Sequence, residues 1–488
     1  MSTTPAQAVR SDVGGAAHER WLVLLGAVMV QSVLGTLYGF SALIKPVQEQ
    51  FKDWSAQDIQ KAFQFAILVF AITMLFAGRL QDRKGPRLPA LIGAVTLCLG
   101  ALLGSLVPAT GSKLLWWLSY GVILGAGTGL TYVCPIAALA KWFPEVKGLI
   151  TGVAVAGFGG GAAIFVPTVA KFLDPKVGHH SLTEFFYAHA LICLVVVGAG
   201  ALLLRNPPEG WQPPQPAKAA AAKPATVDLS WREMLATPRF WLLVAMFFGS
   251  ALAGLMAIGV VKAAVESITF PVNLPVSRVA EAIVPLAKGQ KFADVTMVTK
   301  IKVVTAQQAA LAAVLLSICN ALGRILWGGI SERLGRPRAM LINFLLQAVA
   351  MFTLFAAINA AAKVSFDQMA AAAGAQGMYQ PLEGWHPAAL VAVLFMGFIG
   401  ANFGGVLALF PSATADAFGT KNLGLNYACV FMGYGLAGYL GPQIAAYYKD
   451  VKHAYDPAFL IGGALVALAA VGAVALIAMG RPKAVDTA

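Results

Sequence analysis

Two stretches of this 488-residue chain carry the same pattern. Residues 78–87 read GRLQDRKGPR, and residues 328–338 read GGISERLGRPR. Each stretch begins with a glycine, followed four residues later by an acid and an arginine and then by a second glycine. The first glycines, Gly78 and Gly328, lie 250 residues apart. Because each copy comes directly after an apolar segment, the pair indicates an internal duplication with two related halves.

Long apolar segments surround both copies. The chain is 58% hydrophobic and 12% charged, with a mean hydropathy of +0.73, whereas about a quarter of a soluble protein is charged. A helix that crosses a membrane needs ~20 mainly apolar residues. The sequence therefore predicts an all-α polytopic membrane protein with twelve transmembrane helices in two pseudo-symmetric six-helix halves. The twelve segments are residues 21–44, 62–79, 88–108, 114–140, 148–171, 184–204, 238–262, 306–329, 339–360, 387–410, 423–447 and 457–480.

A Pro- and Ala-rich stretch separates the two halves, and such a composition is typical of a linker. We expect the first nineteen residues, which are polar, to lack regular structure. Two insertions in the second half are expected outside the membrane, on the extracytoplasmic side. The predicted organisation is an N-terminal tail (1–20), a first half (21–204), a linker (205–237), a second half (238–480, with insertions at about 263–305 and 361–386) and a C-terminal tail (481–488).

The arginines are distributed unevenly between the two sides of the membrane. An even number of spans places both termini on one side, and that side holds all arginines of the loops, tails and span ends except Arg278. This bias predicts cytoplasmic termini in a multi-pass protein of the inner (cytoplasmic) membrane. Lysines such as Lys288 and Lys291 dissent, but they lie in a long loop, which weighs little in this rule.

The remaining composition argues against several other classes of protein. The net charge of +13 lies beside lipid headgroups, so the bilayer is an expected partner and nucleic acid is not. The five cysteines stand in apolar runs without a CxxC pair or a histidine at ligand spacing. We therefore expect no metal and no cofactor. A membrane-embedded enzyme would need clusters of His, Asp or Cys at membrane depth, and their absence from the sequence predicts no enzyme.

The duplicated pattern suits a gate between the halves. Glycines allow tight turns and close helix approach, and Asp82 can face the N-terminus of a helix. A plain positively charged loop would account for the arginines, but not for the spacing of glycine and acid in both copies. The expected gate residues are Gly78, Asp82, Arg83, Gly85, Arg87, Glu332, Arg333, Gly335 and Arg338.

Arg324 is the one charged residue that we find deep inside a predicted span. An arginine there costs a few kcal/mol unless it faces water or a partner. Since no acid accompanies it, its natural counter-ion is a carboxylate of the substrate, held by the planar guanidinium. Alternatively, its side chain extends to the lipid headgroups. Asn320, one turn earlier on the same face, is expected to bind the substrate or orient Arg324, or to join neighbouring helices.

Aromatic residues complete the expected site. A small substrate site needs apolar walls with a few polar groups, and tyrosines supply both. Each residue taken alone is also compatible with simple packing. The expected members, on helices that should line a central cavity, are Tyr38, Tyr132, Phe403, Phe431 and Tyr434.

The chain resembles known transporters at several of these motifs. The pattern of residues 78–87 is similar to the signature loop G-x3-D-R-x-G-x-R of the major facilitator superfamily. Residues 141–159 and 418–427 look like the oxalate/formate antiporter family and the related monocarboxylate transporters. The resemblance implies a major facilitator fold and a small carboxylate cargo of the formate, oxalate, acetate, lactate or pyruvate class. Alternating access by anion exchange or proton symport is then expected; the alternative is a carrier of a drug or sugar.

In the resembled families, an arginine at the position of Arg324 binds the carboxylate. This sequence has Asn320 where monocarboxylate transporters usually carry an aspartate, and it lacks their helix-one lysine, expected near Ala42. It also has Tyr434 at or next to the position where the oxalate branch carries a second cation. One intramembrane cation favours a monocarboxylate over a dianion. Protons remain a possible coupling ion, although no buried carboxylate is available to carry them.

Overall fold

The computed structural model describes residues 5–173, 178, 180–208, 211, 228–266, 269–275, 296–302, 306–359, 387–452 and 456–480. Most of the expected linker, the insertion at 361–386 and the C-terminal tail at 481–488 lie outside the described residues. The insertion at 263–305 is described only in part.

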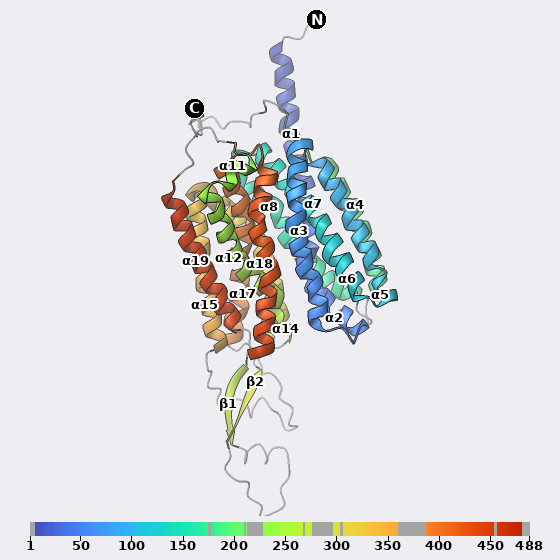
Figure 1. The fold of residues 1–488 in the computed structure, drawn as a ribbon, viewed down its shortest axis with the longest axis vertical. Coiled ribbons are helices and arrows are strands. Elements are labelled where there is room, and N and C mark those ends of the chain that lie inside the picture. Colours follow the sequence, from blue (N-terminus) through green and yellow to red (C-terminus); the bar gives the residue numbers. More distant parts are fainter. Residues whose placement is uncertain are drawn as a thin grey trace, which may run out of the picture.

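The described part is a helical bundle with two sets of helices (Figure 1). The first set comprises α1 (Pro5–Leu34), η1 (Gly35–Phe40), α2 (Ser41–Gln50), α3 (Ala56–Lys84), α4 (Arg87–Gly104), α5 (Val107–Thr110), α6 (Lys113–Trp116), η2 (Trp117–Leu124), α7 (Gly125–Trp142), α8 (Lys147–Phe172), α9 (Leu182–Ile192), η3 (Cys193–Val197) and α10 (Gly198–Leu203). The second comprises α11 (Trp231–Leu235), α12 (Pro238–Glu266), α14 (Ala306–Leu334), α15 (Arg336–Asn359), α17 (Pro387–Phe418), α18 (Leu423–Lys452) and α19 (Asp456–Ala478).

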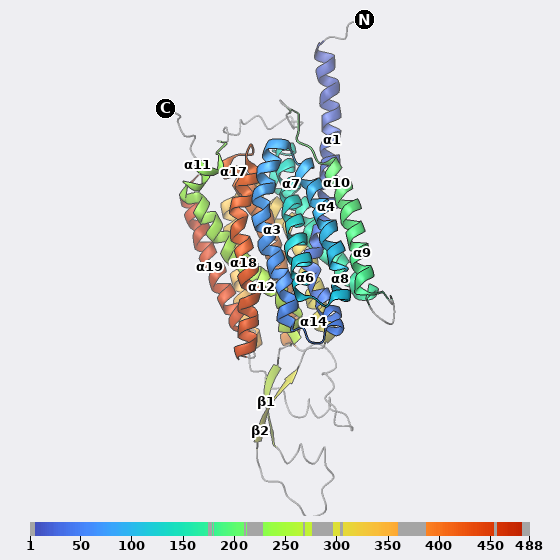
Figure 2. The same ribbon diagram turned by 45° about the vertical axis from the view of Figure 1, so that its right-hand side comes forward.

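Eleven helical segments in the described part are long and apolar enough to cross a membrane. The twelfth expected span, 423–447, corresponds to α18, which has 30 residues but is not among the eleven. It is less apolar because it carries polar groups such as Asn426 and Tyr427 on buried positions. α18 nevertheless packs along α3 and α12 within the bundle, as a spanning helix would (Figure 2).

The structure departs from the sequence prediction outside the bundle. Helix α1 begins at Pro5, so much of the expected N-terminal tail continues the first spanning helix instead of lacking regular structure, and Figure 1 shows it projecting beyond the bundle. The insertion at 263–305 contains a two-stranded antiparallel hairpin, β1 (Thr269–Pro275) and β2 (Thr296–Lys302). This segment adds a small β element outside the helical bundle, where two short extended runs can satisfy each other's backbone groups.

Several predicted spans are not continuous α-helices. The first span changes to a 3₁₀-helix at η1, and the fourth and sixth contain the π-helical segments η2 and η3. At η1, Gly35 packs so closely on the backbone of Phe158 that a side chain would collide with it. Short non-α segments of this kind often mark functional positions, and η1 carries Tyr38.

Two antiparallel helix pairs join the halves: α3 packs on α18, and α8 packs on α14. Helices α8 and α18 begin at one end of the bundle, and α19 ends there; we call it the terminal end (Figure 1). We call the opposite end the hairpin end. Both signature stretches lie at the terminal end, where α3 and α14 finish. Gly85 and Gly335 follow these two helices with φ of 83° and 82°, which glycine adopts without strain.

Candidate substrate site and gates

Arg324 of α14 lies where this helix packs on α8 of the other half, and it is fully buried. Its Nη1 donates to the backbone oxygen of Val155 in α8 at 2.7 Å. Its Nε and Nη2 both donate to Oδ1 of Asn320, at 3.2 and 3.0 Å. Asn320 in turn donates to the backbone oxygen of Gly400 in α17 at 3.3 Å. The guanidinium is therefore held by α8 and, through Asn320, by α17.

This geometry differs from the one in which Arg324 reaches the lipid headgroups. Such a side chain would be exposed at its tip, whereas the described guanidinium is enclosed by protein. Among the described residues no carboxylate pairs with it. Its central carbon instead lies 6.0 Å from the ring centroid of Tyr38 and 5.4 Å from that of Phe158, within the range of cation–π attraction.

Aromatic side chains connect Arg324 to the rest of the expected site. The hydroxyls of Tyr38 and Tyr434 share a hydrogen bond that joins the two halves. Tyr38 packs on Phe403 with ring centroids 6.2 Å apart, and Tyr434 stacks on Phe431 at 4.5 Å. Phe431 in turn lies 5.4 Å from Tyr132. All seven residues expected from the sequence thus belong to one connected cluster around Arg324.

A small cavity lies beside this cluster. Its volume is about 20 Å³, enough for about one water molecule. The helices must therefore separate before a carboxylate can approach Arg324, so any transport requires movement of the halves. The cavity is lined by Tyr38, Gly159, Ala162, Ile258, Leu316, Ser317 and Asn320.

The first signature stretch meets α18, and we name this contact the first gate (Gly78, Asp82, Gly424 and Leu425). Asp82 accepts hydrogen bonds from the backbone N–H groups of Gly424 at 3.0 Å and Leu425 at 2.8 Å. These N–H groups belong to the first turn of α18, where the helix dipole favours a negative charge. Gly78 lacks a side chain at the point where the Gly424 backbone approaches.

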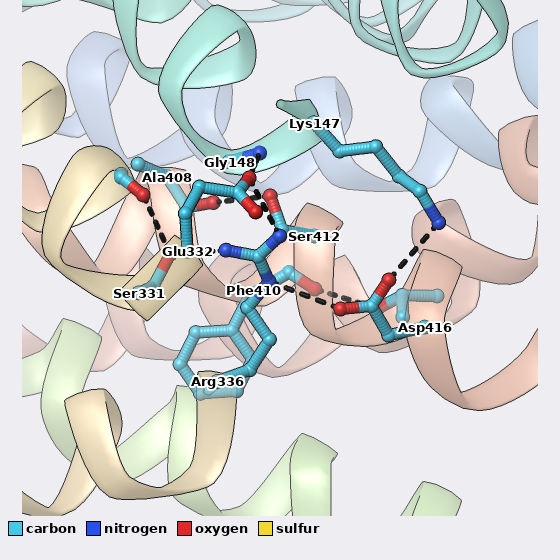
Figure 3. Close-up of polar contacts among 11 residues, drawn as sticks. Lys147, Gly148, Ser331, Glu332, Arg336, Ala408, Phe410, Ser412 and Asp416 are labelled. Carbon is cyan, nitrogen blue, oxygen red and sulfur yellow. Dashed lines mark hydrogen bonds and ion pairs between the residues drawn. The ribbon is translucent and has the colours of Figure 1, made fainter. Parts of the chain in front are cut away.

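The second signature stretch meets α8 in a corresponding way, and we name this contact the second gate (Gly328, Glu332, Arg336, Lys147, Gly148 and Asp416). Glu332 accepts from the backbone N–H of Gly148 at 2.5 Å, and Gly328 packs on the Gly148 backbone. Here charges are added: Figure 3 shows Arg336 between Glu332 and Asp416, at 2.8 and 3.0 Å. Asp416 also pairs with Lys147 of the first half at 3.0 Å.

Comparison with known proteins decides the family. The model of the Major Facilitator Superfamily matches residues 21–277 and 282–487. The chain belongs to the Major Facilitator Superfamily. Among similar solved structures of that superfamily is the transporter FucP in its outward conformation, with a TM-score of 0.59, 16% identity, and coverage of 93% of this chain and 97% of FucP. That likeness shows the fold, so both the superfamily and the architecture expected from the sequence are confirmed.

Curated relatives of this major facilitator chain include carriers named for their substrates. The oxalate:formate antiporter of Oxalobacter formigenes is 26% identical over 474 residues, covering 96% of this chain and 94% of the antiporter. The apicoplast pyruvate carrier 1 of Toxoplasma gondii is 25% identical over an aligned length of 519 residues, covering 88% of this chain and 84% of the carrier. The resemblance noted in the sequence therefore extends over most of the chain.

The two contacts between the halves that we name gates contain residues that the sequence analysis missed. Arg336, Asp416 and Lys147 form the charged part of the second gate, and Arg336 lies inside the duplicated stretch that drew attention to Arg333 and Arg338. Its near-complete burial, which only the structure shows, distinguishes it. The four expected gate arginines are exposed, and no ion pair in the described part involves them: Arg83, Arg87, Arg333 and Arg338.

Phe158 was also missed at the central site, although it stands in a glycine-rich run of α8 that the sequence analysis quoted for its resemblance. Its ring packs edge-on against Tyr38 at 4.8 Å and against Tyr132 at 5.5 Å. Within the described residues, no group of three or more His, Cys, Asp or Glu side chains is placed to hold a metal. The central cluster consists of the guanidinium of Arg324, the amide of Asn320 and aromatic side chains.

Proposed function

We propose that this protein is a secondary active transporter of small carboxylate anions that works by alternating access. The observation that supports it is Arg324, a cation enclosed in the membrane interior with no carboxylate partner in the described part of the chain. A buried charge without a counter-ion is costly. A substrate carboxylate supplies the missing charge, and a planar guanidinium can bind it through two parallel hydrogen bonds.

The single cation supports a monocarboxylate as the preferred cargo. Oxalate would bring a second negative charge into the same enclosure. At about the position where the oxalate branch carries its second cation, this chain has Tyr434. Tyr434 is neutral and already shares a hydrogen bond with Tyr38. The expected substrates are therefore formate, acetate, lactate or pyruvate. Formate and pyruvate occur in the names of the two curated relatives, one of which also names oxalate.

The proposal also includes the driving force of transport and the orientation of the protein in the membrane. Transport is driven either by anion exchange or by a proton gradient. The arginine distribution supports a cytoplasmic position for the terminal end, with the protein in the inner membrane. In this orientation both gates close the cytoplasmic side. Opening the gates would connect Arg324 with the cytoplasm.

The test of the site is uptake by purified protein in proteoliposomes. Arg324→Lys keeps the charge but loses the planar pair of donors, so uptake should fall severely, and Arg324→Ala should abolish substrate binding, a loss on the order of 2–5 kcal/mol. Arg79→Lys, at an exposed arginine of α3, is the matched control and should retain uptake. Near-normal uptake by folded Arg324→Lys protein would remove Arg324 from the binding site.

The test of the cargo is counterflow with labelled mono- and dicarboxylates, with and without a proton gradient. Monocarboxylates should compete at least as well as oxalate. A strict preference for oxalate would contradict the single-cation argument, whereas transport of sugars or drugs without any carboxylate would favour the alternative carrier function. Dependence on the gradient separates proton symport from exchange.

A further inference from the structure

Three carboxamide side chains are buried in the second half, outside the substrate cluster. Asn343 and Gln347 lie one turn apart on the same face of α15, and Asn402 belongs to α17. Their exposed fractions are 0%, 1% and 2%. Asn343 Nδ2 donates to the backbone oxygen of Asn402 at 3.0 Å and lies 3.5 Å from its Oδ1. Asn343 and Asn402 therefore bring polar groups into the interface between α15 and α17, and Gln347 continues the same face of α15 one turn further.

Four polar atoms of these amides have no hydrogen-bond partner among the described residues: Asn343 Oδ1, Gln347 Nε2, Gln347 Oε1 and Asn402 Nδ2. In the interior of a membrane protein, each unsatisfied polar group costs several kcal/mol. An amide cannot lower this cost by changing its protonation state, as a buried acid or amine would. A bound molecule that supplies the missing partners would remove the cost.

The chemistry of the four atoms defines that molecule. Two of them, on Gln347 and Asn402, are N–H donors, and two, on Asn343 and Gln347, are oxygen acceptors. A cation would be repelled by the donors, and an anion would be repelled by the acceptors. Exchanging the oxygen and nitrogen of Gln347 leaves this balance unchanged, because both atoms are unpaired. The matching ligand is neutral and both donates and accepts hydrogen bonds, as water does.

We propose that Asn343, Gln347 and Asn402 form a buried water site that holds about one or two water molecules between α15 and α17. The site is close to the substrate cluster in the fold. Asn343 and Trp327 both approach Gly405 of α17, and a side chain on the adjacent Gly404 would contact Arg324. Bound water gives α17 exchangeable hydrogen-bond partners, so the helix can shift against α15 without leaving a polar group unpaired.

Hydroxyl-radical labelling of the intact wild-type protein in lipid nanodiscs tests the site directly. A side chain beside bound water is oxidised much faster than an equally buried side chain in a dry core. Trp327 is the probe, since it lies against the same glycine as Asn343. Trp116, fully buried in the first half, is the control. We expect at least about fivefold faster labelling of Trp327 than of Trp116; equal rates would overturn the proposal.

Substitution of Gln347 then assigns the water to the amides. Gln347→Met keeps the length of the side chain but removes two polar atoms, so labelling of Trp327 should decrease and the unfolding temperature should fall. In a dry site the same change would remove two unpaired buried groups and raise the unfolding temperature, which would overturn the proposal, as would unchanged labelling of Trp327. Val349→Met, at an exposed position of the same helix, controls for the introduction of methionine.

Discussion

The first and second gates use the same backbone contact, but they differ in the charges around it. In both, a carboxylate at the end of one helix accepts from N-terminal N–H groups of a helix from the other half, two for Asp82 and one for Glu332, and a glycine allows the backbones to touch. Asp82 acts without an ion pair in the described structure. Glu332 shares Arg336 with Asp416, which also binds Lys147.

This difference teaches that duplication preserved the helix-terminus contact while the surrounding charges diverged. The interaction of Asp82 with backbone N–H groups is short-range and little affected by salt. The pairs of the second gate include the partly exposed Asp416, so salt should weaken them. The second gate should therefore be the stronger one at low ionic strength, and the first gate the more constant one.

The largest effect is expected for Arg336→Met, which leaves Glu332 and Asp416 without their shared cation. Removing one partner of a largely buried ion pair costs roughly 2–4 kcal/mol once partial exposure is allowed for. The ratio of molecules closed at the terminal end to molecules open there should fall at least tenfold. Spin labels at the exposed Leu88 and Leu334, on opposite halves, report the opening by electron–electron distance measurement.

Arg338→Met is the control for that experiment, because Arg338 is exposed and forms no ion pair in the described part. Its distance distribution should match that of the wild type. An equal shift in both variants would mean that the loss of any nearby positive charge opens the gate, and the network in Figure 3 would lose its special role.

Next in size is a matched pair of glycine substitutions, Gly78→Ala and Gly328→Ala. Each added methyl group would collide with the backbone of Gly424 or Gly148 in the facing helix, and overpacking of this kind costs about 1–3 kcal/mol. Uptake should decrease at least tenfold in both variants. Gly329→Ala is the control, since its methyl group would meet only Leu149, at 3.6 Å. Similar losses in all three variants would contradict a gate-specific contact.

A smaller effect is expected for Asp82→Asn. The amide oxygen can still accept a hydrogen bond, but the charge at the α18 N-terminus is lost, which is worth about 1 kcal/mol. Turnover should slow about fivefold while substrate affinity stays nearly constant, because the change alters the balance of open and closed states. Asp58→Asn, in the same helix but paired with Lys113 within the first half, is the control. Unchanged turnover would remove Asp82 from the gate.

The sequence sufficed for features that depend on local pattern or on the membrane. The spacing of Gly78 and Asp82, repeated in the second half, predicted contacts that need a small residue and an acid at a helix end. Arg324 was predicted from the cost of a charge in lipid. These inferences need no knowledge of how the halves pack, and the structure places all three residues at the interface between the halves.

Pairings between the halves could not be read from the sequence. Lys147 and Asp416 are 269 positions apart, and Tyr38 and Tyr434 are 396 apart. Which residues face each other depends on the angle and register of helix pairs, and a shift of one residue would change every partner. The 3₁₀ geometry of η1 was also missed, because its residues are as apolar as the helix that precedes them.

The smallest effect is expected for Lys147→Met, and it separates the two gates most clearly. Lys147 and Asp416 are 13% and 42% exposed, and an ion pair with this much solvent contributes only about 0.2–1 kcal/mol. Asp416 also keeps Arg336 as a partner in the variant.

At low ionic strength the closed population, measured by the spin-label distances, should therefore decrease by less than about fivefold. In 1 M salt, where the screening length is about 3 Å, variant and wild type should coincide. The effect of Asp82→Asn on the closed population should decrease less in the same buffer, because the Asp82 carboxylate is partly buried against the N–H groups of Gly424 and Leu425, and salt screens such a charge less than an exposed one. A Lys147→Met shift that equals that of Arg336→Met, or that is independent of salt, would show that the two gates do not differ in the way their charges indicate.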